Sequence, residues 1–243
     1  LDGVSGLLVY TNDKKIKLYT RGTATHGMDI TRLLKYIPNI PTYDDISKRD
    51  LIAFRGELII PKKTFKKNWS HKMKNARNTV SGLVNSKNIN PELAKDTRFV
   101  VYEVVDPLMK ISKQFEIIKE LNFNCVHHKM VSKINYDYLS KYLVKRKNKS
   151  KYEIDGIIVT NNKLHKRNVK GNPKYAFAFK DILEEQKAIT KIIDIVWKKS
   201  KDGYINPTII IEPVEIGGVT IKRATAFNAK YVKDNMLGKG AVI

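Results

Sequence analysis

Alternating apolar and polar residues predict β-strands at the start of the chain. Residues 1–10 and 14–20 alternate on either side of a polar turn, which is typical of a β-hairpin. Residues 51–60 form a further apolar strand, but they contain the charged triplet Arg55-Gly56-Glu57. Because a buried charge needs a polar partner, this strand is expected to carry more than packing contacts. Between these strands, residues 29–36 predict a short helix.

The rest of the chain predicts helices and strands in alternation, and then strands alone. A basic helix is expected from Pro61 to Trp69, followed by an ordered loop and the start of a helix in residues 75–85. The basic run at residues 145–151 is predicted to be a solvated loop. Further helices are expected at 112–121 and 136–144, and strands at 98–105, 153–160, 174–180, 189–197, 206–213 and 218–225. The change to closely spaced strands predicts a domain boundary near residues 183–187.

The charge balance points to a polyanionic partner. The chain has 243 residues, with 46 Lys and Arg against 24 Asp and Glu, which gives a formal net charge of +22. Such a surface repels itself unless negative charge offsets it, so nucleic acid is the favoured partner. An acidic membrane face and a lysine-rich coding bias are the alternatives. No apolar run is long enough to span a membrane and no signal peptide is recognisable, so we expect a soluble intracellular protein.

Four charged residues fall inside otherwise apolar segments: Asp2, Glu57, Asp155 and Lys180. They could form buried ion pairs among themselves, but desolvation can cancel the Coulomb gain of such pairs. A shared polar ligand explains them better. Cations would meet the phosphate of a nucleotide, one carboxylate would accept hydrogen bonds from ribose hydroxyls, and another would help to hold a metal ion.

A series of motifs in fixed order then identifies a family. The segments are LDGVSG, TRGTATHGMDIT, FRGELIIPKKTF, NARNTVSGLV, EIDGIIV, YAFAFK and DGYINPTIIIEPVEIGGVTIKRATAFNA. Together they resemble the adenylation domain and the beginning of the OB-fold domain of NAD-dependent DNA ligases. The resemblance implies an α+β nucleotidyltransferase domain with antiparallel sheets at residues 1–186. A partial OB-fold β-barrel would occupy residues 187–243.

The resemblance also implies roles for particular residues. Asp2 would lie beside the nucleophile and Lys180 would neutralise charge on the transferred phosphate, which makes these two the catalytic residues. The nucleotide-binding residues would be Arg21, Glu57, Arg77, Asp155 and Lys180, and Asp155 would also help to place a divalent metal. Purely structural roles are the alternatives: a turn residue for Asp2, an exposed turn arginine for Arg21, and an ion pair with Arg55 for Glu57.

The chain departs from the family pattern at several places. The nucleophilic lysine would be the residue immediately before Leu1, and the domain that recognises the nicotinamide half of NAD would also lie outside this chain. Thr160 stands where the family has a lysine, Asn85 where an arginine is expected, and Phe227 in place of a histidine. These departures predict that this chain alone cannot react with NAD, and they leave reduced activity open.

The activity implied is the sealing of 5′-phosphate/3′-hydroxyl nicks in duplex DNA, as in replication and repair. The cofactors would be NAD and Mg²⁺, with AMP as a covalent intermediate, and a monomer is expected. Basic runs at residues 62–63, 66–67, 72–74 and 145–151 suit contact with the DNA backbone, with a solvated face as the alternative. Two other functions stay open: a nucleotidyltransferase using ATP or GTP, and a catalytically impaired ligase-like module that binds DNA without chemistry.

Overall fold

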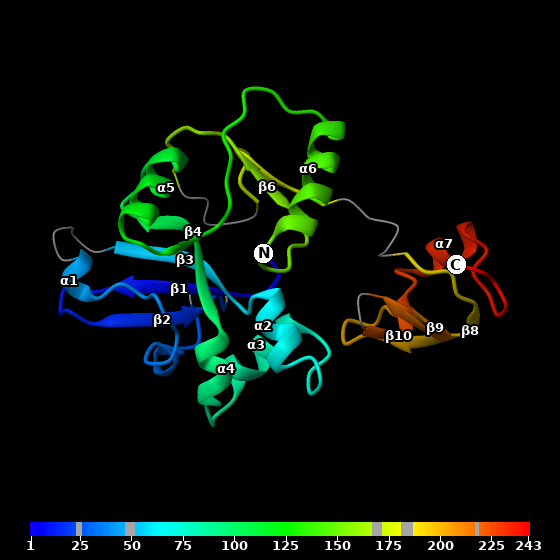
Figure 1. Cartoon of the computed structure of the whole chain (residues 1–243). Helices are drawn as coiled ribbons and strands as arrows, with labels where there is room; N and C mark the ends of the chain where they lie inside the picture. Colours follow the sequence, from blue (N-terminus) through cyan, green and yellow to red (C-terminus); the bar gives the residue numbers. More distant parts are fainter. Residues whose placement is uncertain (23–25, 47–51, 167–171, 181–186, 217–218) are drawn as a thin grey trace. The chain divides into compact units, whose positions relative to one another are not determined.

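A computed structural model describes residues 1–22, 26–46, 52–166, 172–180, 187–216 and 219–243 (Figure 1). The chain divides into two compact units, Leu1–Asp181 and Ile182–Ile243. Both units are mixed α/β structures built on antiparallel strands. The predicted boundary after residue 186 adjoins residues 181–186, which lie outside the described residues, so its exact position stays a prediction.

The first unit is built on a five-stranded sheet with the order β2-β1-β3-β4-β5. All neighbours pair antiparallel except β4 and β5, which pair parallel. The predicted hairpin forms β1 and β2, and the charged strand forms β3 at the centre of the sheet; Leu51 lies outside the described residues. The strands are β1 (Val4–Tyr10), β2 (Ile16–Thr20), β3 (Ile52–Ile59), β4 (Arg98–Asp106) and β5 (Asn124–Cys125).

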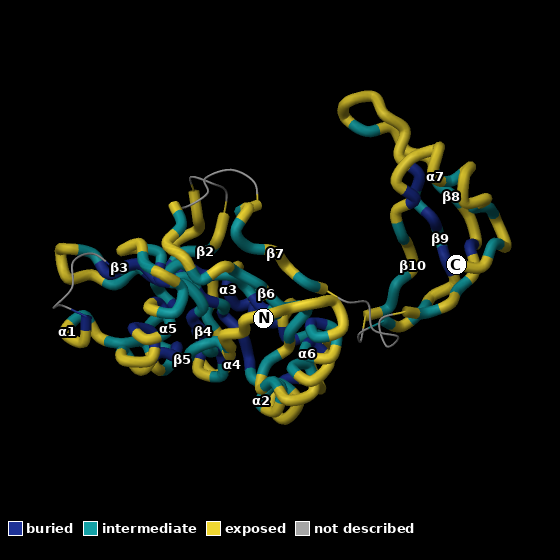
Figure 2. The backbone as a smooth tube through the Cα atoms, turned by 90° about the horizontal axis from the view of Figure 1, so that it is seen from above, coloured by how far each residue is buried: buried dark blue, intermediate teal, exposed yellow. Residues whose placement is uncertain are grey.

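One hydrophobic cluster joins this sheet to the helices around it. The sheet contributes fully buried side chains such as Leu8, Phe54 and Phe99. Helices add Val80 and Ile118 to the same cluster, and Figure 2 shows the burial concentrated along the strands rather than the connecting loops. The helices concerned are η1 (Thr31–Leu33), α1 (Tyr43–Ile46), α3 (Ala76–Asn85), α4 (Pro91–Asp96) and α5 (Ile111–Glu120). This core holds the charged strand β3 in place.

A smaller two-stranded sheet and two basic helices complete the first unit. Strands β6 (Ile157–Thr160) and β7 (Ala176–Phe179) pair antiparallel and are shorter than the sequence predicts. The basic helices are α2 (Lys62–Asn68) and α6 (Tyr136–Lys149). In Figures 1 and 2 these helices lie next to each other.

Helical structure extends further than the sequence pattern predicts at two places. Residues 145–151 are not a loop, because α6 continues through Lys149; lysine and arginine are good helix formers and favour a helix C-terminus. Residues 76–85 form the complete helix α3, which Asn75 caps because its side chain accepts a hydrogen bond from the Asn78 N–H. By contrast, the helix expected at 29–36 is only the short 3₁₀ turn η1. The sequence pattern does not predict α4, β5, the short helix α1 (Tyr43–Ile46) or the helix α7 (Ala229–Asp234).

The second unit is a three-stranded antiparallel sheet with the order β10-β9-β8, followed by helix α7. Its small core contains Ile192, Ile209, Ile211 and Ala226. These elements are β8 (Ile192–Lys199), β9 (Ile205–Ile216), β10 (Val219–Thr225) and α7 (Ala229–Asp234). Within the residues described in both units, no helix has the length and apolar character required to cross a membrane.

Candidate active site

Two Asp-Gly pairs place carboxylates directly before strands β1 and β6 of the first unit. A Cβ on Gly3 would lie 2.3 Å from the Leu58 carbonyl oxygen, and one on Gly156 would lie 2.7 Å from the Phe179 carbonyl oxygen. Real Cβ atoms do not approach backbone oxygens so closely, so only glycine permits these contacts. The preceding aspartates, Asp2 and Asp155, are thereby held beside β3 and β7 respectively.

Glu57 points toward the first of these turns. The Gly3 N–H donates a hydrogen bond to Glu57 Oε1 at 3.1 Å. Burial raises the pKa of the Glu57 carboxyl, and nearby Asp155 adds to this; the Gly3 hydrogen bond and Arg77 act in the opposite direction without cancelling it. Glu57 is therefore a partly desolvated acceptor surrounded by other site residues.

Arg77 lies in the first turn of α3 and pairs with Asp2. Its Nη1 donates to Asp2 Oδ1 at 2.7 Å, and this bond together with the charge of Asp2 raises the pKa of Arg77. The Asp2 N–H also donates to the Glu153 carbonyl at 2.9 Å. The segment leading to Asp155 is thus tied to the start of β1.

Asp155 and Lys180 form the second ion pair of the site, with 2.8 Å between Oδ2 and Nζ. Burial raises the pKa of Asp155, but the Lys180 hydrogen bond and charge outweigh it and leave this pKa lowered. The same hydrogen bond raises the pKa of Lys180. Both groups consequently stay charged, and both remain partly open to solvent.

Arg21 directly follows β2 and takes no part in these ion pairs. Its N–H donates to the Ser5 carbonyl at 3.2 Å, and Ser5 stands opposite Glu57 in the register of β1 and β3. Arg21 therefore occupies the same row as Glu57, with its side chain exposed. Among the ion pairs formed within the described residues, none includes Arg21.

The polar face of the sheet includes residues that the sequence motifs do not single out. Ser5 Oγ and Tyr102 Oη lie 2.9 Å apart next to the row of Glu57, and burial raises the pKa of Tyr102. Arg55 pairs with Glu103 at 3.2 Å rather than with Glu57. The alternative in which Glu57 forms a structural pair with Arg55 is thus wrong. The strand alternation could have indicated Ser5, because it shares a face with Leu7 and Val9 rather than with the buried Leu8.

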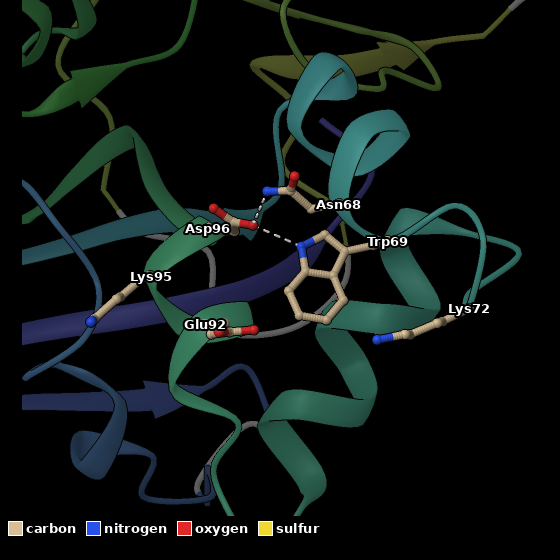
Figure 3. Close-up of a pocket in the computed structure, with 6 residues that line it drawn as sticks. All are labelled: Asn68, Trp69, Lys72, Glu92, Lys95 and Asp96. Atoms are coloured by element: carbon tan, nitrogen blue, oxygen red, sulfur yellow. Dashed lines mark hydrogen bonds between the residues drawn. The ribbon is translucent and has the colours of Figure 1, made fainter.

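A separate pocket of about 490 Å³ lies between the end of α2 and α4 (Figure 3). Its lining residues are Asn68, Trp69, Lys72, Glu92, Lys95 and Asp96. None of the predicted site residues contributes to it. Asn68 Nδ2 and Trp69 Nε1 each donate to Asp96 Oδ2 at 2.8 Å, and Trp69 is buried, so these contacts hold the two helices together.

The departures from the family pattern have definite places in the structure. Asn85 ends α3 and donates to the Ser81 carbonyl at 2.9 Å. Thr160 ends β6 opposite Ala176. Phe227 is 62% exposed and packs edge-on against a tyrosine of α7.

A metal held by protein side chains alone does not fit the site. Throughout the described parts of the chain, no three His, Cys, Asp or Glu side chains are grouped so that they could bind a metal ion. Mg²⁺, however, is commonly held by one or two carboxylates together with substrate phosphates. Asp155, with its lowered pKa and partial exposure, fits that kind of shared site.

Comparison with known proteins identifies the family. The model of the NAD-dependent DNA ligase adenylation domain matches residues 1–182. A DNA ligase of Acanthamoeba polyphaga mimivirus is 44% identical over 246 residues, which cover 100% of this chain and 38% of that protein. A DNA ligase of Aquifex aeolicus is 30% identical over 267 residues, covering 100% of this chain and 37% of that protein. The chain therefore spans well under half the length of these relatives. It belongs to the family of NAD-dependent DNA ligase adenylation domains.

Proposed function

We propose that this chain is the catalytic core of an NAD-dependent DNA ligase that seals nicks in duplex DNA. The observation that carries the proposal is the convergence of five side chains at the start of β1. Immediately after Leu1, Asp2 pairs with Arg77 and its N–H donates to the Glu153 carbonyl, while the Gly3 N–H donates to Glu57 Oε1, so a residue bonded to Leu1 would lie among these side chains. The nucleophilic lysine is assigned to that position. The five side chains are Asp2, Glu57, Arg77, Asp155 and Lys180.

The reaction proceeds in three steps. The lysine Nζ attacks the adenylyl phosphorus of NAD, so that a P–N bond forms and the bond to nicotinamide mononucleotide breaks. The 5′-phosphate of DNA then attacks the same phosphorus, which releases the lysine and forms DNA-adenylate. Finally, the 3′-hydroxyl attacks the 5′-phosphate, a phosphodiester forms and AMP leaves.

Each side chain has a task that its environment suits. Glu57 accepts hydrogen bonds from the ribose hydroxyls, because it is an acceptor on a partly buried strand. Arg77 and Lys180 neutralise charge on the transferred phosphate, since phosphoryl transfer depends mainly on positioning and electrostatic stabilisation. Asp2 holds Arg77, and Arg21 approaches the nucleotide from the end of β2.

A divalent ion, Mg²⁺, would be held by Asp155 together with phosphate oxygens and would neutralise negative charge there. The Asp155–Lys180 pair must then separate, which leaves Lys180 available for the phosphate. Residues 1–186 would form the nucleotidyltransferase domain. Residues 187–243 would form the beginning of an OB-fold that binds DNA. The protein is proposed to act as a soluble intracellular monomer in replication or repair.

Intact-mass measurement tests this proposal. The protein, with the sequence upstream of Leu1 included, is incubated with Mg²⁺ and either NAD or ATP. A gain of one adenylyl group with NAD alone, mapped to the residue before Leu1, is the expected result. A gain with ATP instead would assign the protein to another class of nucleotidyltransferase. No gain with either, together with binding to nicked DNA, would make it a non-catalytic DNA-binding module, a function that Thr160 and Asn85 favour.

A further inference from the structure

Lys62 joins the two basic helices of the first unit at one corner. Its N–H donates to the Lys151 carbonyl at 2.8 Å, and its Nζ donates to the Lys147 carbonyl at 2.9 Å. The same Nζ lies 3.4 Å from Glu153 Oε2. The start of α2 and the end of α6 are therefore fixed next to each other, as Figures 1 and 2 also show.

These helices carry positive charge with almost no local compensation. Helix α2 contains four lysines and no acid, and α6 contains five Lys or Arg residues with Asp137 as its one acid. Lys141, Lys145 and Lys149 follow each other at four-residue intervals and are exposed. Like charges at this spacing repel each other along a helix face, so a negative partner would stabilise the row. We call the exposed lysines of these helices the α2–α6 basic surface: Lys63, Lys66, Lys67, Lys141, Lys145 and Lys149.

This surface adjoins the candidate active site. Glu153, whose side chain pairs with Lys62, accepts a hydrogen bond from the Asp2 N–H through its carbonyl oxygen. It precedes Asp155 by two residues. A polyanion lying on the basic surface therefore passes close to the carboxylates and cations of the site.

The dimensions fit a nucleic-acid backbone. At about 1.5 Å per helical residue, the row from Lys141 to Lys149 extends about 12 Å. One strand of B-form DNA advances about 3.4 Å for each phosphate, so this row spans about three to four phosphates. Lysine suits this role, because it contacts phosphates as a point charge without reading sequence.

We propose that the α2–α6 basic surface binds the phosphate backbone of the duplex that flanks the nick. This inference rests on the proposed ligase function, since it supplies the path along which that DNA leaves the active site. Binding here is independent of sequence and weakens with salt, because each neutralised phosphate releases counterions. It adds affinity for DNA without taking part in the reaction with NAD.

The test compares two triple variants of the full-length protein with equal loss of charge. The first is Lys141→Ala, Lys145→Ala and Lys149→Ala. The control replaces exposed lysines elsewhere in the same unit: Lys35→Ala, Lys87→Ala and Lys119→Ala. Fluorescence anisotropy with a nicked duplex, over salt concentrations of about 50 to 200 mM, gives affinity and the slope of log K against log salt. Adenylation by NAD is measured on the same proteins, and a Lys→Arg triple at the α6 positions checks that charge is the cause.

The expected result is a salt slope smaller by about two to three in the α6 alanine triple, from about 0.9 per lost phosphate contact. The arginine triple should keep the slope of the unchanged protein, the control triple should shift it by less than one, and adenylation should stay unaltered in all. Equal slopes for the two alanine triples would overturn the inference and leave the ligase function standing. A reduced slope in a protein that NAD does not adenylate would keep the DNA surface and overturn the proposed chemistry.

Discussion

Arg77 reaches 75 positions back along the chain to pair with Asp2, at 2.7 Å between Nη1 and Oδ1. The pair connects the first turn of α3 to the turn that precedes β1, next to the position assigned to the nucleophile. Its Arg77 side chain is 57% exposed, and exposed ion pairs contribute less than about 1 kcal/mol to stability. The pair therefore contributes little to the stability of the fold.

Replacing Arg77 should lower the activity and leave the stability nearly unchanged. Arg77→Ala is expected to lower the rate of adenylation by NAD on the order of 10²-fold, since it removes a cation from the transferred phosphate. The melting temperature should change little. Intact-mass measurements at a series of reaction times, together with thermal unfolding, check this. Arg223→Ala on β10 is the control. Unfolding at a much lower temperature with an unchanged adenylation rate would contradict the assignment.

Glu57 is expected to lower the free energy of unfolding at neutral pH and to be needed for nucleotide binding. Its pKa is raised in the folded protein from a reference value of 4.5, mainly by burial. The folded state then binds the proton more tightly than the unfolded state, so this carboxyl makes the free energy of unfolding fall as pH rises through the window above about 4.5. Glu57→Gln should remove that fall and leave the protein at least as stable at pH 7, but it should weaken nucleotide binding.

Urea unfolding at several pH values measures this effect, with Glu92→Gln, on an exposed part of α4, as the control. Glu57 would have to be reassigned if its glutamine variant bound nucleotide normally, or if the pH dependence were unchanged.

Gly156 and Gly82 provide a matched pair of glycines. Gly156→Ala would place a Cβ 2.7 Å from the Phe179 carbonyl oxygen, which should cost about 1–3 kcal/mol and move Asp155 away from Lys180. Gly82→Ala meets no heavy atom within 4 Å on helix α3, so it should stabilise by about 0.5–1 kcal/mol. Chemical denaturation of both variants tests the prediction, and adenylation should fall only for Gly156→Ala. The same loss of activity in both variants would disprove the close contact.

Asp96 should matter for stability alone. It accepts hydrogen bonds from both Asn68 and Trp69, and its replacement leaves the buried Trp69 N–H without this acceptor. Asp96→Ala should cost about 1–3 kcal/mol, whereas Asp96→Asn, which can still accept, should cost less. Denaturation midpoints check the order of the two variants. Adenylation should persist in both at temperatures where they are folded, and its loss there would connect the pocket of Figure 3 to the chemistry.

The sequence predicts four of the five strands of the large sheet, because alternation marks the hairpin of β1 and β2 and apolar runs mark the buried strands β3 and β4. Strand β5 has two residues, which is too short for a pattern. The sequence predicts the identity of the site residues only through the family motifs. The partners of those residues depend on contacts such as Arg77 with Asp2, which lie 75 positions apart and which no local pattern encodes. The sequence pattern ends α6 too early, because the charged last turn of this helix resembles a solvated loop. The last turn is helical because it continues a helix whose earlier turns bury Leu139 and Leu143.

The segment 151–153 ties two distant elements to one short piece of backbone. The Lys151 carbonyl accepts a hydrogen bond from the Lys62 N–H, and the Glu153 carbonyl accepts one from the Asp2 N–H. These amide protons, sixty positions apart in the chain, can exchange with solvent only when the same three residues move away. Hydrogen exchange at Asp2 and Lys62 should therefore follow a common opening, in which the site turn and the first turn of α2 are released as one cooperative unit.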